Sequence, residues 1–215
     1  MMDYGMNQRA KARTRARFVR EAPDVRRQAM IDATARCLAE KGVGGTSVRA
    51  ICARAGVSSG LLTHYFDGVD ALILATYHDI GTKVSAAVDA AIEAAGDDDP
   101  CDRLRACLQA NFLKPILDPD LLATWIAFWS LVKTDPGIAA VHAEVYGGTR
   151  AHLESLLRAA APAMDAARAR IAAISLTALV DGLWLELCLD SSTFSPAEAQ
   201  AMVEAAMMQA LTVTD

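Results

Sequence analysis

The feature that most constrains this 215-residue chain is a helix start signal that recurs through its second half. Aspartate directly precedes proline at positions 99, 118 and 135. The carboxylate can cap the free N–H groups of a first helical turn, and proline is tolerated at the first position because its missing N–H has no helical partner there. Ser195, Pro196 and Glu198 have the spacing of a capping box. Because runs of Val, Ile and Thr with period two are absent, the sequence predicts an all-α protein.

Glycine, proline and acidic breaks divide the chain into nine predicted helices joined by short loops, which favour antiparallel packing. The predicted ranges are 23–42, 47–55, 59–66, 69–95, 100–117, 119–133, 136–160, 165–190 and 196–211.

Charge is distributed unevenly along the chain. The whole sequence carries a net charge of −5, yet residues 1–66 hold twelve Lys or Arg against five Asp or Glu. Six of those basic residues lie in the first twenty positions, where there is little to bury. A basic end on an acidic body is expected when one end of a protein meets phosphates. An ordinary disordered tail is the alternative interpretation.

Residues 46–66 have the pattern of two short helices joined by a tight turn. Gly56 permits the positive φ that such a turn needs. Leu61 and Leu62 would bury the inner side of the second helix, and Thr46 is expected to cap the first. A helix-turn-helix of this kind presents its second helix to the major groove of DNA, although a plain helical hairpin has the same spacing.

The stretch 56–66 (GVSSGLLTHYF), with Asp70 and Leu72 after it, resembles the DNA-binding signature of TetR-type regulators. Residues 125–129 (WIAFW) and 181–185 (DGLWL) resemble the choline-responsive BetI-type branch. The resemblance implies a TetR-like fold of nine helices and a homodimeric repressor that leaves DNA when a small molecule binds. It also implies three parts, namely a flexible basic arm over 1–22, a helix-turn-helix domain over 23–68, and an effector-binding and dimerisation domain over 69–215.

Two positions depart from the family pattern. Val69 stands where the family usually has a lysine near the DNA backbone at the start of the fourth helix, so one phosphate contact is in question. Glu186 stands where the branch often has a basic residue, and it is two positions past Trp184, so it points roughly the opposite way.

The second helix of the motif contains no Arg or Lys, the side chains that most often read guanine with two hydrogen bonds. Hydroxyl groups, one histidine and one tyrosine remain for base and phosphate contacts. Arms such as residues 1–22 can follow a minor groove. The predicted DNA contacts are Thr46, Ser47, Arg49, Ser58, Ser59, Thr63, His64 and Tyr65, with Arg9, Lys11, Arg13, Arg15 and Arg17 from the arm.

Two half-sites on one face of DNA require a dimer, for which the last two helices offer small and Met-rich faces. The intervening helices carry aromatic residues at helical spacing, which indicates either core or a cage for an organic cation. The predicted effector contacts are Phe112, Trp125, Phe128, Trp129, Tyr146, Asp181 and Trp184. A neutral apolar effector is the alternative to a cation.

Other classes of function lack support in the sequence. The chain has neither a HExxH, a GxSxG nor a phosphate-binding glycine loop, so an enzyme is not expected. Five cysteines without ligand spacing predict buried thiols, with a redox sensor as the alternative, and no metal or cofactor. No uninterrupted apolar run approaches a bilayer span, so a cytoplasmic protein without membrane contact is expected. A helical interaction adaptor with a basic arm that binds nucleic acid without sequence preference is the rival function.

Overall fold

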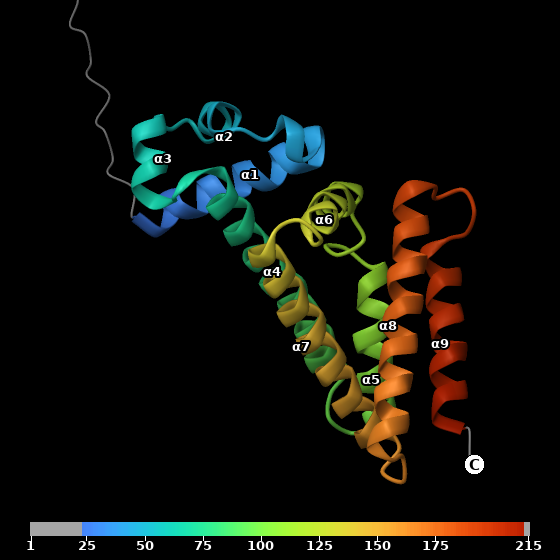
Figure 1. Ribbon diagram of the computed structural model, residues 1–215. Coiled ribbons are helices and arrows are strands. Elements are labelled where there is room, and N and C mark those ends of the chain that lie inside the picture. The colour runs from blue at the N-terminus through green and yellow to red at the C-terminus, as the bar shows by residue number, and fades with distance from the viewer. Residues whose placement is uncertain (1–22, 213–215) are drawn as a thin grey trace, which may run out of the picture.

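The computed structural model describes residues 23–212, and within that range the all-α prediction is confirmed (Figure 1). Its nine α-helices and one 3₁₀ helix fall into a head (residues 23–67) and a body (residues 68–212). The head contains α1 (Pro23–Gly45), α2 (Val48–Ala55) and α3 (Ser59–Tyr65). The body contains α4 (Gly68–Ala94), α5 (Pro100–Gln109), η1 (Ala110–Phe112), α6 (Pro119–Leu131), α7 (Pro136–Ala160), α8 (Ala166–Leu189) and α9 (Pro196–Thr212).

The predicted start signals act as expected at the body helices. The carboxylates of Asp99, Asp118 and Asp135 accept hydrogen bonds from the first amides of α5, α6 and α7, each with proline in the first turn. At α9, the Ser195 hydroxyl accepts from the Glu198 amide (3.2 Å) while the Glu198 carboxylate accepts from the Ser195 amide (2.7 Å). Side-chain caps therefore define where these four helices begin.

Each part has its own hydrophobic cluster. The head core includes Met30, Ile31, Ile51 and Leu62, all at most 1% exposed. The body core extends through all the helices from α4 to α9, and Leu38 on the inner side of α1 joins it. The long helix α4 leaves the head and runs into the body beside α7, so it is the main element common to both parts (Figure 1).

Helix α6 forms the second junction between the two parts, because it packs across α1 (Figure 1). The Thr124 hydroxyl of α6 lies 3.4 Å from the Ala35 carbonyl of α1. A change in the position of either α4 or α6 would therefore act on the orientation of α1.

Two predicted helix boundaries are wrong. Helix α1 continues to Gly45 through a kink at Gly42, where φ is 62°, whereas an end at residue 42 was expected. The helix expected over 100–117 ends at Gln109, followed by η1 and a loop that leads to Asp118. Pro115 supplies no N–H for a helix interior, and the Asn111 amide donates to the carbonyls of Cys107 and Leu108 (both 3.1 Å), which satisfies the helix end early.

Candidate nucleic-acid interface and effector cavity

The turn between α2 and α3 is set by glycine and two serine caps. Gly56 adopts φ 66° and ψ 31° at the end of α2, the left-handed conformation that favours glycine. The Ser47 hydroxyl accepts from the Ala50 amide (3.3 Å) and the Ser58 hydroxyl accepts from the Leu61 amide (3.2 Å), so each serine begins one helix. The fully buried Leu62 holds α3 against the head core. The arrangement leaves one side of α3 free.

The free side of α3 carries Ser59, Thr63 and His64, all exposed, as the spacing predicts. The Thr63 hydroxyl donates to the carbonyls of Ser59 and Gly60 (both 3.2 Å), so it presents acceptor lone pairs outward. Tyr65 is half-buried, and its ring meets the His64 ring edge-on at 5.3 Å. Hydroxyls and an imidazole on one exposed helix face suit the groove and phosphates of DNA.

Thr46 was expected to cap α2, and this prediction is wrong. Ser47 is the N-cap, whereas the Thr46 hydroxyl donates to the Gly42 carbonyl (2.8 Å) and the residue is 8% exposed. The kink in α1 turns Thr46 back toward its own helix end, which removes its hydroxyl from the outer surface. Arg49 is exposed beside Ser47, and Arg54 forms an ion pair with Glu40 of α1. Arg49 is therefore the freer of the two arginines for a phosphate contact.

Val69 is half-buried and packs against both hydrophobic clusters at the start of α4. A lysine there would place its charge close to Asp67 and Asp70, but valine supplies packing instead of a cation. The expected arm contacts of residues 9–17 lie outside the described residues.

A small cavity lies inside the body, with a volume of about 80 Å³. Four of the predicted effector contacts line it together, namely Trp125, Tyr146, Asp181 and Trp184. The Trp184 indole N–H donates to the Ile116 carbonyl (3.0 Å), so the ring is held in place with its N–H satisfied. Two indole rings and a carboxylate around one cavity have the chemistry that attracts an organic cation.

Asp181 is the charged group of this cavity. Burial raises the pKa of its carboxyl to about 6, while hydrogen bonding by Tyr146 and the positive charge of Arg150 oppose that increase. Burial also raises the pKa of the Tyr146 phenol, which therefore stays protonated and remains a donor. The effect of burial outweighs that of Arg150, so the half-desolvated carboxylate gains more from a bound cation than an exposed one would.

The Thr177 hydroxyl, one helical turn before Asp181, lies buried at the cavity wall. Its oxygen has no hydrogen-bond partner among the described residues. A buried hydroxyl without a partner is uncommon and costs free energy until a group binds it. The cavity therefore offers a hydrogen-bonding group as well as a carboxylate.

Three predicted effector contacts do not reach the cavity lining. Phe112 and Phe128 are at most 1% exposed in the body core, where the Phe128 ring stacks on Tyr77 at 4.3 Å. Trp129 is half-buried and packs against the same core. Their spacing was read correctly as one face of a helix, but only Trp125 on that face meets the cavity.

A wider cavity of about 360 Å³ opens between α4 and α7 next to the inner one. The two share five lining residues, Val84, Asn111, Trp125, Val145 and Thr149, so they adjoin each other. We call the wider space the vestibule.

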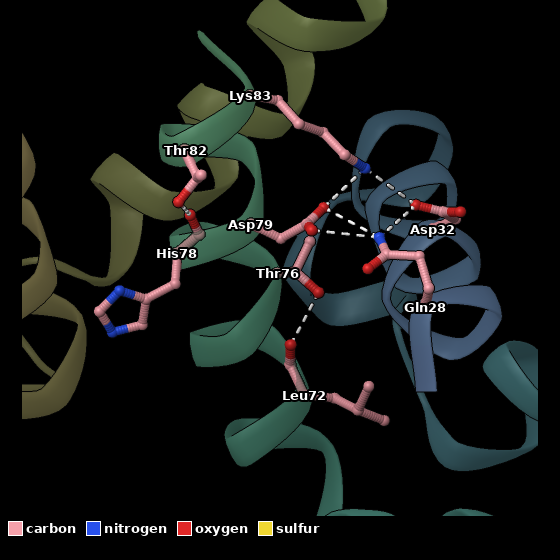
Figure 2. A network of polar contacts seen from close by, with 8 residues as sticks. All are labelled: Gln28, Asp32, Leu72, Thr76, His78, Asp79, Thr82 and Lys83. Carbon is pink, nitrogen blue, oxygen red and sulfur yellow. Dashed lines mark hydrogen bonds and ion pairs between the residues drawn. The ribbon is translucent and has the colours of Figure 1, made fainter. Parts of the chain in front are cut away.

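A polar cluster, here called the clasp, joins α1 to α4 (Figure 2). Lys83 of α4 reaches Asp32 of α1 (3.2 Å) and Asp79 of its own helix (2.7 Å). The Gln28 amide of α1 donates to Asp32 (3.0 Å) and Asp79 (3.1 Å). Figure 2 shows these four side chains pointing toward one another between the helices. The clasp makes the orientation of the head depend on the position of α4.

The cysteines form no bonds with one another. All five are free, with Cys37 and Cys52 buried in the head. Burial raises the pKa of the Cys107 thiol to about 12, which keeps it protonated. Within the described residues, no group of His, Cys, Asp and Glu side chains is arranged to hold a metal ion.

An exposed recognition helix on a small head, joined to a helical body with an enclosed cavity, defines a DNA-binding transcriptional regulator. A family model described as bacterial regulatory proteins of the tetR family matches residues 30–76. A model described as the C-terminal part of the BetI-type transcriptional repressor matches residues 100–212. The chain belongs to the TetR family and has a BetI-type C-terminal domain. Its family consists of transcriptional regulators, not enzymes.

Similar proteins agree with this assignment. The HTH-type transcriptional regulator BetI of Burkholderia thailandensis is 37% identical over 171 residues, 80% of this chain and 86% of that protein. The BetI regulator of Serratia proteamaculans is 33% identical over 83% of this chain and 88% of that protein. A transcriptional regulator of Pseudomonas aeruginosa PAO1 has 42% identity, a TM-score of 0.83, and coverage of 90% of this chain and 94% of its own.

One structural neighbour was solved with a ligand. A transcriptional regulator from Saccharomonospora viridis in complex with choline has a TM-score of 0.75 and 17% identity, over 86% of this chain and 96% of its own. At that identity the likeness shows the shared fold.

Helix α8 is long and apolar enough to cross a membrane by length and composition alone, although it contains no uninterrupted apolar run of that length. Polar Asp181 and Glu186 interrupt its run, yet alanine, leucine and isoleucine fill most of the rest. Asp181 faces the cavity and α8 packs between α7 and α9, as in a helix of a folded body. Its remaining apolar surface stays exposed in the single chain.

Proposed function

We propose that this chain is a cytoplasmic, ligand-released repressor that binds a palindromic operator as a homodimer and takes an organic cation of the quaternary ammonium class as effector. The observation that carries the effector class is the inner cavity, where Asp181 lies among Trp125, Trp184 and Tyr146. Aromatic faces and a buried carboxylate both favour a cation over a neutral or anionic ligand. The S. viridis regulator, which shares this fold, was solved in complex with choline, and this supports the same class of effector here.

The effector needs more space than the inner cavity offers alone. At about 80 Å³ it is smaller than the roughly 150 Å³ cavity that takes up benzene. We infer that the adjoining vestibule supplies the rest of the space and the access from solvent. A cation that enters between α4 and α7 would displace α4, and the clasp would pass that displacement to α1.

The outer faces of α8 and α9 support the dimer. Ile171 is 63% exposed and Ile174 is 40% exposed on α8, and Met202 (40%) and Met208 (44%) are exposed on α9. Large apolar side chains gathered on two adjacent helices mark a contact surface. We place the dimer interface there, with α8 and α9 of a second copy completing a four-helix contact.

DNA binding is assigned to the exposed side of α3, with Ser47 and Arg49 at the start of α2 on the phosphates and the arm in an adjacent groove. Deletion of residues 1–20 is expected to weaken DNA binding and to flatten its dependence on salt. Without the phosphate contacts of the arm, binding releases fewer counterions from the DNA. An unchanged salt slope would remove the arm from the interface.

The test is a fluorescence-polarisation titration of the purified protein with DNA from its own promoter region and with scrambled DNA of equal length. Sequence-specific regulation requires saturable binding at least about 10³-fold tighter to the promoter DNA. Choline added to the complex is expected to release the DNA, and Asp181→Asn is expected to bind DNA normally but to resist release. If choline releases the parent protein and Asp181→Asn equally from DNA, the cation site is contradicted. If only uncharged compounds release the parent protein from DNA, a neutral effector is favoured.

A further inference from the structure

A chemically different, third cavity lies at the junction of head and body. It is a crevice of about 260 Å³ between α1, α4, α6 and the loop before α6. We call it the hinge crevice. Its walls are almost wholly apolar and include Ala35, Ala39, Ile80, Val84, Ile116 and Leu121.

Small side chains on α1 keep the hinge crevice open. Ala35 and Ala39 lie one helical turn apart on the side of α1 that faces the crevice. The neighbouring Leu38 is buried in the body core instead. Leucine at either alanine would fill part of this space. Water in an apolar concavity is unfavourable, so the crevice gains free energy when an apolar group replaces that water.

The charges around the hinge crevice cancel or are already engaged. Lys83 is bound to the two carboxylates of the clasp. The Asp118 carboxylate accepts from two amides of α6, at 2.8 and 3.4 Å. Arg36 and Asp120 lie exposed on the rim with opposite charges. In contrast to the inner cavity with Asp181, neither sign of ligand charge is favoured here.

We propose that the hinge crevice is a second effector site, which binds a neutral apolar molecule, a medium-chain aliphatic or a single-ring aromatic compound. Its volume exceeds the roughly 150 Å³ that benzene needs. Such a ligand fits between walls that are mostly apolar, and the Thr124 hydroxyl among them already donates to the Asp120 carbonyl (2.9 Å). Recognition therefore depends on burial of apolar surface and on shape.

Occupancy of the hinge crevice would act on DNA binding through its position. Its walls belong to α1 of the head and to α4 and α6 of the body, so a bound molecule contacts both body helices that pack on α1. Val84 and Ile116 also line the inner cavity, so the two sites adjoin each other. By linkage, any factor by which the ligand changes DNA affinity equals the factor by which DNA changes ligand affinity.

The experiment is isothermal titration calorimetry of the full-length protein with octanol as probe, and with octanoate and octylammonium as charged probes of equal length. Ala39→Leu fills the crevice, Leu121→Ala removes part of its wall, and Ala86→Leu is the control at an exposed position on α4. The expected result is saturable binding of one octanol per chain, weakened at least about tenfold by Ala39→Leu and unchanged by Ala86→Leu. Thermal unfolding and promoter-DNA binding of each variant verify that it is folded.

Comparison of sites separates this proposal from the cation site. Asp181→Asn is expected to weaken choline binding at least about tenfold and to leave octanol binding unchanged, whereas Ala39→Leu is expected to weaken octanol binding and to leave choline binding unchanged. The hinge site is overturned if octanol binds Ala39→Leu and Leu121→Ala as tightly as the parent, or if the charged probes bind as tightly as octanol. It is also overturned if Asp181→Asn alone removes octanol binding, because the probe then occupies the inner cavity.

Discussion

The affinity of this protein for a quaternary ammonium ion is expected to fall in mild acid, because the counter-charge in its cavity titrates near neutrality. The Asp181 carboxyl has a pKa raised to about 6 by burial. A permanently charged ligand binds the ionised form, so its binding expels a proton and its affinity decreases as the pH falls. Between pH 7.5 and pH 5 the ionised fraction drops from nearly all to about one in eleven, and the dissociation constant should rise about tenfold.

The stability of the unliganded protein should respond to Asp181 in the opposite direction. Its folded pKa lies above the ordinary value of 3.8, so the folded state favours the protonated carboxyl. The contribution of this group to stability is therefore fully present below the unfolded pKa and is lost as the pH rises through about 6. Loss of cation affinity in acid then cannot be ascribed to unfolding caused by this group.

Calorimetric titration with choline at several pH values between 5 and 7.5 measures the effect, with circular dichroism to verify the fold. Asp181→Asn should bind choline at least about tenfold more weakly at pH 7.5, since a charge-assisted contact is lost, and its affinity should not vary with pH. A parent protein whose affinity stays constant over that range would refute the reasoning, and so would an Asp181→Asn protein that keeps the pH dependence.

Three further outcomes are expected. Gly56→Ala should destabilise the head by about 1 kcal/mol in thermal unfolding, because alanine is strained at φ 66°, whereas Gly147→Ala in the middle of α7 should stabilise slightly. Ile171→Glu should convert the dimer to monomers in light scattering, whereas Ala140→Glu on an exposed part of α7 should not. If Ile171→Glu remains a dimer, the interface lies elsewhere. Asp79→Asn should change stability by less than about 1 kcal/mol, because Lys83 is 58% exposed, yet it should reduce the effect of choline on DNA affinity. Full choline release in Asp79→Asn would show that the clasp is not part of the coupling.

The helix-turn-helix could be predicted from sequence because its signals are local. Gly56 needs only its own backbone conformation, and Ser58 needs only an amide three residues ahead. The Asp-Pro pairs act within one turn in the same way. Thr46 was misassigned because the competing acceptor, the Gly42 carbonyl, becomes available only through a kink in the preceding helix. Local chemistry could not decide between two adjacent hydroxyls.

The cavity was only partly predictable, because its walls come from segments far apart in the chain. Helical spacing correctly placed Trp125 with Phe128, but it could not tell which of the two meets empty space and which stacks on Tyr77. The loop before α6 was not predicted, because the sequence was interpreted as one continuous helix over 100–117 despite Pro115. That loop brings Ile116 to the cavity, where its carbonyl holds the Trp184 indole at 3.0 Å. The residue that orients the aromatic wall is thus an aliphatic one acting through its backbone, and composition or spacing carries no signal for such a role.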